Sequence, residues 1–272
     1  MPLPTRSYGH CRPSPPLRRL PPHHGKDRNM KRSCLLALAL LWTGVESPAQ
    51  TVLQQFAAVS AGAGTVSDMD LPQPTVKGSV LIAMPMLLTP DVQVVSITDN
   101  APAGGNTYKQ VKGSTSSCAK QSLDIWYCEN CNPDVTELKF HLSGHVRASI
   151  NNFMEVSGLA LSSVLDGIGA GVSDGTLTSE GSGAGPTLTT AVEDFVIAPY
   201  FSTPPLPTGV TPAAWTHHPS YVYVLKAPAA TYHPTLTGGK PGKNFCMSMA
   251  AFKTAPSSPA SPPPTARQPQ SH

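Results

Sequence analysis

The stretch from Val92 to Asn132 constrains the fold more than any other part of the chain. It contains three runs with β-strand character, and turn-forming residues at Asp99-Asn100 and Gly104-Gly105-Asn106 separate the first two. Beyond residue 50, no window of about eleven or more residues shows the 3.6-residue apolar repeat of an amphipathic helix. The 272 residues also include 30 prolines and 22 glycines, which limit the length of regular elements. The sequence therefore predicts an all-β protein.

Two segments indicate how the strands are arranged. Ser79–Leu88 is almost entirely apolar, as expected for a strand covered on both faces, with Pro85 displacing its second half to a sheet edge or a bulge. Thr136–Asn152 alternates apolar and polar residues on both sides of a short loop at 143–145, which predicts a β-hairpin. Roughly a dozen short strands over residues 50–253 predict a single antiparallel β-sandwich or jelly-roll domain.

The start of the chain has the pattern of an exported protein. Residues 30–49 combine a positive start, the apolar run Cys34–Trp42 and small residues before Gln50, which predicts a secretory signal peptide cleaved near Gln50. The apolar run of about nine residues is far shorter than the ~20 that a membrane-spanning helix needs, so we expect no transmembrane segment in the mature chain. We expect a secreted, extracellular or cell-surface protein.

The two ends of the chain differ in composition from the β-rich region. Residues 1–29 are rich in proline, arginine and histidine, and we expect a disordered or mis-assigned extension there. Residues 254–272 are rich in proline and serine and predict a disordered tail. The formal net charge of +3 comes from the basic residues among 1–32, and the remainder is slightly acidic. That distribution excludes a basic nucleic-acid surface.

Several short motifs occur in a characteristic order between about residues 55 and 253. They are A-G-A-G-T-V, S-V-L-I-A-M, V-x-S-I-T-D-N followed by G-N-T-Y, I-W-Y-C-E-N, F-M-E-V-S-G-L and a final M-A-A-F-K. In this order the chain resembles a widespread group of secreted bacterial β-sandwich modules of unassigned activity. The resemblance implies a surface or extracellular module and supplies no catalytic residues. Cys128 after Trp-Tyr, and the other cysteines, depart from the pattern of the group.

Four cysteines remain after the predicted cleavage: Cys118, Cys128, Cys131 and Cys246. In an exported protein an even number of cysteines predicts two disulfides. If Ser122–Cys128 is extended, Cys118 and Cys128 lie ~20 Å or more apart, whereas a bridge needs Cα atoms within ~7 Å. Two connectivities remain, and we favour Cys128–Cys131 with Cys118–Cys246 over Cys118–Cys131 with Cys128–Cys246.

Two carboxylates offer an enzymatic alternative. Glu129 and Glu155 each follow a segment containing an aromatic residue, and two carboxylates ~5–9 Å apart are what glycoside hydrolysis requires. The competing interpretation is that each carboxylate ends a strand or pairs with a nearby cation. We favour the competing interpretation, because the sequence holds no denser acidic cluster. We therefore expect a protein without enzymatic activity more than an enzyme.

Asp99, Asn100 and Asn106 surround a glycine-rich loop and carry the oxygen ligands that Ca²⁺ prefers. The competing interpretation is a loop in which the same side chains bind nearby backbone N–H groups. We favour this second interpretation and expect no required cofactor.

Aromatic residues could provide a platform on which sugar rings stack. The candidates are Trp126, Tyr127, Trp215, Tyr221 and Tyr223. Trp126 and Tyr127 alternate, so they point to opposite faces of a strand and at least one belongs to the core. Trp215 lies in a proline-rich loop and is the best candidate for an exposed ring, although loop aromatics more often close the end of a sandwich. We expect the adjacent His217 and His218 to face solvent.

The sequence contains none of the usual motifs of nucleotide-binding proteins, serine hydrolases or zinc proteases. We therefore expect a secreted binding or structural module whose partner is an extracellular glycan or another cell-surface molecule. A glycan-directed hydrolase or lyase that uses Glu129 and Glu155 is the alternative. A structural spacer or filament subunit is the third possibility.

Overall fold

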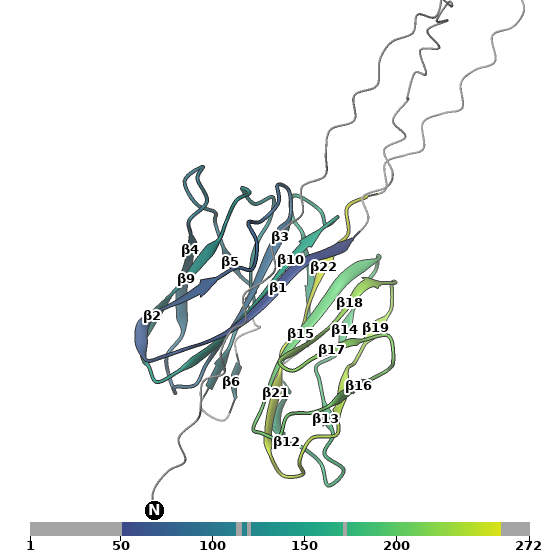
Figure 1. Cartoon of the computed structure of the whole chain (residues 1–272). Helices are drawn as coiled ribbons and strands as arrows, with labels where there is room; N and C mark the ends of the chain where they lie inside the picture. Colours follow the sequence, from purple (N-terminus) through teal and green to yellow (C-terminus); the bar gives the residue numbers. More distant parts are fainter. Residues whose placement is uncertain (1–50, 113–115, 119–120, 171–172, 257–272) are drawn as a thin grey trace, which may run out of the picture. The chain divides into compact units, whose positions relative to one another are not determined.

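Every regular element that the computed structural model describes is a β-strand (Figure 1). The structure describes residues 51–112, 116–118, 121–170 and 173–256. Over these residues, 22 strands form five sheets in which all pairs are antiparallel. The predicted all-β sandwich class is therefore confirmed. The strands outnumber the predicted dozen because several, such as β13 (Gly183–Ala184), contain only two residues.

The five sheets differ in size. Sheet I contains β1 (Val52–Ala61), β10 (Ser149–Ser157), β3 (Val80–Leu87), β7 (Gln121–Leu123), β6 (Ser116–Cys118), β8 (Trp126–Cys128) and β5 (Lys109–Gln110). Sheet II contains β2 (Gly64–Asp70), β9 (Glu137–Val146) and β4 (Val94–Asp99). Sheet III contains β11 (Leu165–Ile168), β22 (Ala250–Lys253), β15 (Asp194–Ser202), β18 (Tyr221–Ala227), β17 (Thr216–His218), β21 (Asn244–Met247) and β12 (Ser173–Thr176). Sheet IV contains β13, β20 (Thr235–Thr237) and β16 (Gly209–Thr211), and sheet V contains β14 (Leu188–Thr189) and β19 (Thr231–Tyr232).

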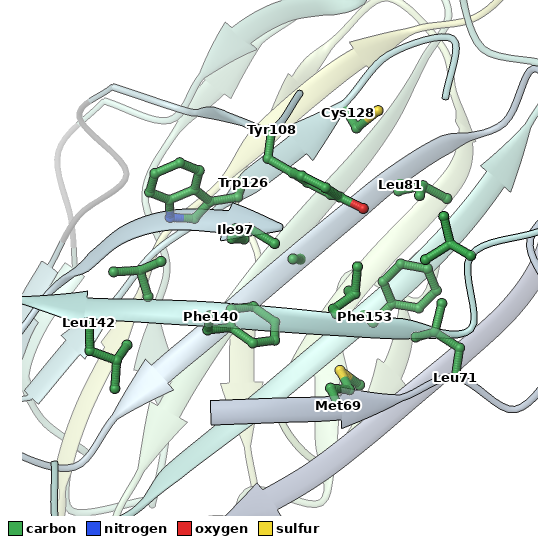
Figure 2. Close-up of a cluster of buried hydrophobic side chains, with 14 of the residues drawn as sticks. Met69, Leu71, Leu81, Ile97, Tyr108, Trp126, Cys128, Phe140, Leu142 and Phe153 are labelled. Atoms are coloured by element: carbon green, nitrogen blue, oxygen red, sulfur yellow. The ribbon is translucent and has the colours of Figure 1, made fainter. Parts of the chain in front are cut away.

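Strand β3 is buried along its whole length and has a different core on each face. Leu81 and Ala83 pack with Phe140 of sheet II, in the core that Figure 2 shows in close-up. Ile82 and Met84, which alternate with them, pack instead in a core shared with sheet III. Because side chains alternate along a strand, an apolar run of this kind fits a strand that is covered on both faces, as the sequence predicts.

Sheet III is also covered on both of its faces. Phe195 and Ile197 of β15 pack in the core shared with sheet I. Val196 and Ala198 pack in a third core, to which Leu236 of sheet IV contributes. The order of layers is therefore sheet II, sheet I, sheet III and then the two small sheets. A simple sandwich has only two such layers.

Pro85 does not displace β3 to an edge, so that expectation is wrong. The strand lies between β10 on one side and β7 and β8 on the other. The Pro85 carbonyl accepts from the backbone N–H of Asp124 (3.2 Å), in the gap where the partner strand divides into β7 and β8. Proline supplies no N–H, and the interruption lies on the side where that N–H would have pointed.

The predicted hairpin at 136–152 does not form. Strand β9 pairs with β2 and β4 in sheet II, whereas β10 pairs with β1 and β3 in sheet I. Phe140 of β9 and Phe153 of β10 nevertheless pack in the same core. The chain therefore passes from one layer to the next between these strands, because alternation specifies the buried face of a strand and not its partner.

The predicted extension at 1–29, the signal peptide at 30–49 and most of the C-terminal tail lie outside the described residues. At the start of the tail, Thr254 forms a β-bridge with Leu159, and the backbone N–H of Ala255 donates to the Gly158 carbonyl (2.9 Å). Antiparallel pairing thus continues two residues beyond the predicted end of the domain.

Candidate functional site

A groove of about 700 Å³ lies where sheet I meets strand β11 of sheet III. Strands β5 and β8 supply one wall, and β11 supplies the other. The lining residues are Lys109, Gln110, Lys112, Trp126, Tyr127, Leu165, Asp166, Gly167 and Ile168. Two of the five aromatic candidates from the sequence, Trp126 and Tyr127, are among them.

Trp126 and Tyr127 are neighbours on β8 and belong to different cores. Trp126 packs with sheet II and is 6% exposed, whereas Tyr127 packs with sheet III and is 8% exposed. The sequence predicted that the two side chains point to opposite faces of the strand. Both of them are buried in a core, so neither is an exposed platform. Trp126 Nε1 is buried and has no hydrogen-bond partner within the described part of the chain. The Tyr127 ring lies on the face of sheet I that meets β11 and contributes to the floor of the groove, whereas the Trp126 ring points to the opposite face. Neither residue leaves a broad exposed ring face.

Ion pairs hold charged side chains in place at the edge of the groove. Lys109 pairs with Glu129, which also accepts from the backbone N–H of Val164 (3.1 Å). Burial raises the pKa of the Glu129 carboxyl, but the hydrogen bonds from Lys109 and Val164 outweigh it and hold that pKa below its ordinary value. The same Glu129 hydrogen bond raises the pKa of the Lys109 ammonium group. The Lys109 ammonium group lies 5.9 Å from the centre of the Tyr127 ring.

The second wall ends in an acidic pair that the sequence analysis missed. Asp166 of β11 pairs with Lys253 of β22 (3.4 Å), and Lys253 lies opposite Asp194 in the sheet. Asp194 is fully buried, and its carboxyl group lies within hydrogen-bonding reach of the Asp166 carboxylate. Burial, together with the nearby Asp166 carboxylate, raises the pKa of Asp194 to about 7.

Glu129 and Glu155 do not form a catalytic pair. Leu81 pairs with Cys128 on one side and with Glu155 on the other, so these two side chains share a face of sheet I. Glu129 follows Cys128 and points to the opposite face. Glu155 is buried and accepts from Gln55 Nε2 (2.7 Å) and from the Val76 backbone N–H (2.6 Å). Two carboxylates on opposite faces of one sheet cannot flank a single glycosidic bond.

The predicted calcium ligands bind protein donors instead. Asp99 accepts from the Ala101 N–H (3.1 Å), the Asn106 N–H (3.2 Å), Asn106 Nδ2 (2.7 Å) and the Tyr108 hydroxyl (2.8 Å). Asn100 Oδ1 accepts from two backbone N–H groups, those of Thr136 and Glu137. The structure thus shows the backbone-binding loop that the sequence analysis favoured.

This polar network also holds the loop against the segment that follows Cys131. Asn106 Oδ1 accepts from the Asn132 N–H (2.7 Å). Burial raises the pKa of the Tyr108 hydroxyl, and the Asp99 carboxylate raises it further. In the described residues, no three histidine, cysteine, aspartate or glutamate side chains come together as a metal-binding group.

Trp215 is buried and does not form an exposed platform. It is 6% exposed and packs edge-on against Tyr232, with ring centres 6.1 Å apart. The loop aromatic closes the third core, which is the more common outcome named above. Tyr221 is also a core residue, and Tyr223 is half-buried beside it.

His217 and His218 are half-buried, so the expectation that they face solvent is wrong. His218 stacks on Tyr221, with ring centres 4.2 Å apart. His217 Nε2 and the Tyr200 hydroxyl are 3.0 Å apart. Burial lowers the pKa of both imidazoles, and His217 lowers that of His218 further.

The cysteines support the favoured connectivity. Cys128 and Cys131 form a disulfide, with Cα atoms 5.9 Å apart. Cys246 is fully buried and is also disulfide-bonded. Because Cys128 and Cys131 bind each other, the alternative in which Cys246 pairs with Cys128 is excluded. The Cys118 side chain lies outside the described residues, and the Cys118–Cys246 bridge remains a prediction.

The described residues include no helix that is long and apolar enough to cross a membrane. No family model, no curated protein and no solved structure matches this chain.

Proposed function

We propose that the chain is an exported, non-catalytic module that binds an extracellular glycan in the groove between β5, β8 and β11. The observation that carries the proposal is the combination of the Tyr127 ring on the floor of the groove with charged side chains held beside it by ion pairs. Ligand sites are mostly apolar concavities in which a few well-placed polar groups provide specificity, and their volumes run from ~300 to ~1,000 Å³. The groove of about 700 Å³ falls within this range.

The polar groups of the groove suit a ligand with many hydroxyls. Lys109 and Lys112 donate only, and Asp166 accepts. The amide of Gln110 can do both, and its Nε2 already donates to Asp124 Oδ1 (3.3 Å). The ion pairs Lys109–Glu129 and Lys253–Asp166 limit the freedom of the Lys109 and Asp166 side chains before a ligand arrives. Less conformational entropy is then lost on binding. A sugar presents C–H groups that can contact an aromatic floor and hydroxyls that can meet such donors and acceptors.

Export is supported by two independent features. Residues 30–49 have the charge, apolar run and cleavage pattern of a secretory signal. The Cys128–Cys131 disulfide fits an oxidising compartment, where such bonds form and persist.

The test is glycan-array screening followed by calorimetry with the glycan that binds. Lys112→Ala and Gln110→Ala should each weaken binding roughly tenfold, as expected when one good polar contact is removed. Lys240→Ala is the matched control, because Lys240 is also exposed and does not line the groove. Equal binding by all three variants would place the glycan site elsewhere. The absence of any glycan ligand on the array would reject the ligand class.

A further inference from the structure

Strand β1 (Val52–Ala61) is an edge of sheet I (Figure 1). It has ten residues and pairs with β10 on one side. On its other side, no described residue forms a backbone hydrogen bond with it. Backbone N–H and C=O groups alternate between the two sides of an antiparallel strand, so about half of those of an edge strand point outward. Strand β1 therefore presents a row of unpaired donors and acceptors.

The other edge strands of the described sheets are short or charged. Strand β2 carries the exposed Asp68 and Asp70, and β4 ends at Asp99. The remaining edge strands, β5, β6, β11, β12, β13, β14, β16, β17 and β19, have four residues or fewer. Short length and charge are two common devices that keep a sheet edge from pairing with another chain. Strand β1 has neither device, because it is long and its sequence V-L-Q-Q-F-A-A-V-S-A contains no charged residue and no proline.

Most of β1 is also regular enough to accept a further strand. A bulge, which is another device that protects edges, lies at its start between Leu53 and Gln55. From Gln55 to Ala61 the register with β10 is continuous. Phe56 lies in this regular part and is 49% exposed, although its ring packs edge-on against His218 of β17, with ring centres 5.4 Å apart. The regular part of the edge thus combines free backbone groups with an exposed aromatic side chain.

The C-terminal tail of the same chain begins near this edge, but its composition is poorly suited to pair with it. The Ala255 N–H donates to the Gly158 carbonyl (2.9 Å), and the preceding Ser157 pairs with Val52. Residues 257–272 therefore follow a point close to the first residue of β1. Five of these sixteen residues are proline. Proline has no N–H to donate, so such a segment cannot complete a regular ladder.

We propose that two copies of this chain associate through their β1 strands. The strands pair antiparallel around a two-fold axis near Ala58, the exposed residue at the middle of Gln55–Ala61, and join the two copies of sheet I into one continuous sheet. Because β1 is uncharged, this pairing places no like charges opposite each other. Each copy uses its own free edge, so the assembly closes as a dimer. The proposal does not depend on glycan binding, because β5 and β8 of the groove lie at the other end of sheet I.

Analytical ultracentrifugation of the exported protein should give twice the monomer mass at micromolar concentration, with dissociation on dilution. Ala58→Lys brings two lysines together near the axis and should weaken dimerisation about tenfold or more, and Ala58→Glu should do the same. An equimolar mixture of these two variants should restore the dimer, because opposite charges then face each other. Val95→Lys is the matched control, because Val95 is 58% exposed on the edge strand β4 and should not affect the dimer.

Hydrogen exchange locates the interface without any substitution. Amides of residues 55–61 should be more protected in the dimer than in the diluted monomer, because the outward N–H groups gain partners. A monomer at every concentration, a larger open assembly, or a dimer without this protection would overturn the proposal. A dimer that persists in both charged variants would also overturn it. Removal of residues 257–272 tests the tail as the occupant. Association that occurs only after this removal would show that the tail covers β1 and would contradict self-pairing in the full chain.

Discussion

At the scale of single residues, Asp194 is a carboxyl group in a buried site that disfavours its ionised form. Its carboxyl group lies beside Asp166, opposite Lys253 and close enough to Tyr232 to raise the pKa of that hydroxyl, although burial contributes more. The raised pKa of about 7 means that the folded protein holds this proton more tightly than the unfolded chain does. The neutral carboxyl is therefore the form that the fold stabilises.

Stability should consequently depend on pH through Asp194. Its contribution is fully present below the ordinary pKa of 3.8 and is lost as the pH rises through about 7. Asp194→Asn keeps the shape and removes the charge, so relative to the unsubstituted protein it should gain on the order of 2 kcal/mol between pH 4 and pH 8. Urea unfolding of both proteins across this range measures the difference.

The informative quantity is the difference in free energy of unfolding between Asp194→Asn and the unsubstituted protein at each pH. Burial lowers the pKa of His217 and His218, so their contribution is lost as the pH falls, which is the opposite direction. Subtracting one curve from the other removes the histidine effect. A difference that stays constant from pH 4 to pH 8 would show that Asp194 titrates normally.

Single residues of the groove differ in how well the sequence reveals them. Trp126 and Tyr127 could be selected because large aromatic residues on a strand are few and conspicuous. Asp166 and Asp194 could not, because no local pattern joins them. They approach only because β11 and β15 both pair with β22. Such proximity is a property of sheet order, which short-range sequence patterns do not encode.

At the scale of elements, the loop between β4 and β5 is ordered by side chains that bind its own backbone. Asp99 receives hydrogen bonds from two backbone N–H groups and from the Asn106 and Tyr108 side chains. Gly104 and Gly105 have φ values of 106° and 83°, which residues with a side chain rarely adopt. The turn chemistry was therefore readable from the sequence, whereas the partner of each strand was not.

This loop should be stable without a metal. Asp99→Ala leaves several donors without an acceptor and should cost about 2–4 kcal/mol in free energy of unfolding. Thermal unfolding of the unsubstituted protein should be unchanged by excess calcium or by EDTA. Asp70→Ala serves as a control, because Asp70 is an exposed aspartate on β2, outside the loop. A rise in melting temperature with calcium that Asp99→Ala abolishes would restore the calcium-site hypothesis.

At the scale of the whole described unit, the sequence predicts the class and misses the number of layers. A fully apolar strand such as β3 predicts burial on both of its faces. It does not say whether the second face meets a helix, a loop or another sheet. Here it meets sheet III, and sheet III is in turn covered by two small sheets whose strands have two or three residues. Strands that short carry too little periodicity to be recognised.

The disulfides connect this layered architecture to the compartment. Strand β6, which contains Cys118, contacts β21, which contains the disulfide-bonded Cys246. A Cys118–Cys246 bridge would join sheets I and III and close a loop of more than about a hundred residues. In the chain-entropy model such a loop is worth up to ~4–5 kcal/mol, whereas Cys128–Cys131 closes almost nothing.

Cys118→Ser and Cys246→Ser should therefore lower the free energy of unfolding by similar amounts, and the double variant should lose no more than either single variant. This non-additivity is the signature of one shared bond. Replacing both Cys128 and Cys131 by serine should lower the free energy of unfolding much less through loop entropy, because their loop is short. Any further loss would come from placing serine at two buried positions. Peptide mapping of the non-reduced protein should show Cys246 joined to Cys118. Additive losses, or a free thiol at either position, would mean that sheets I and III are held together by their shared apolar core alone.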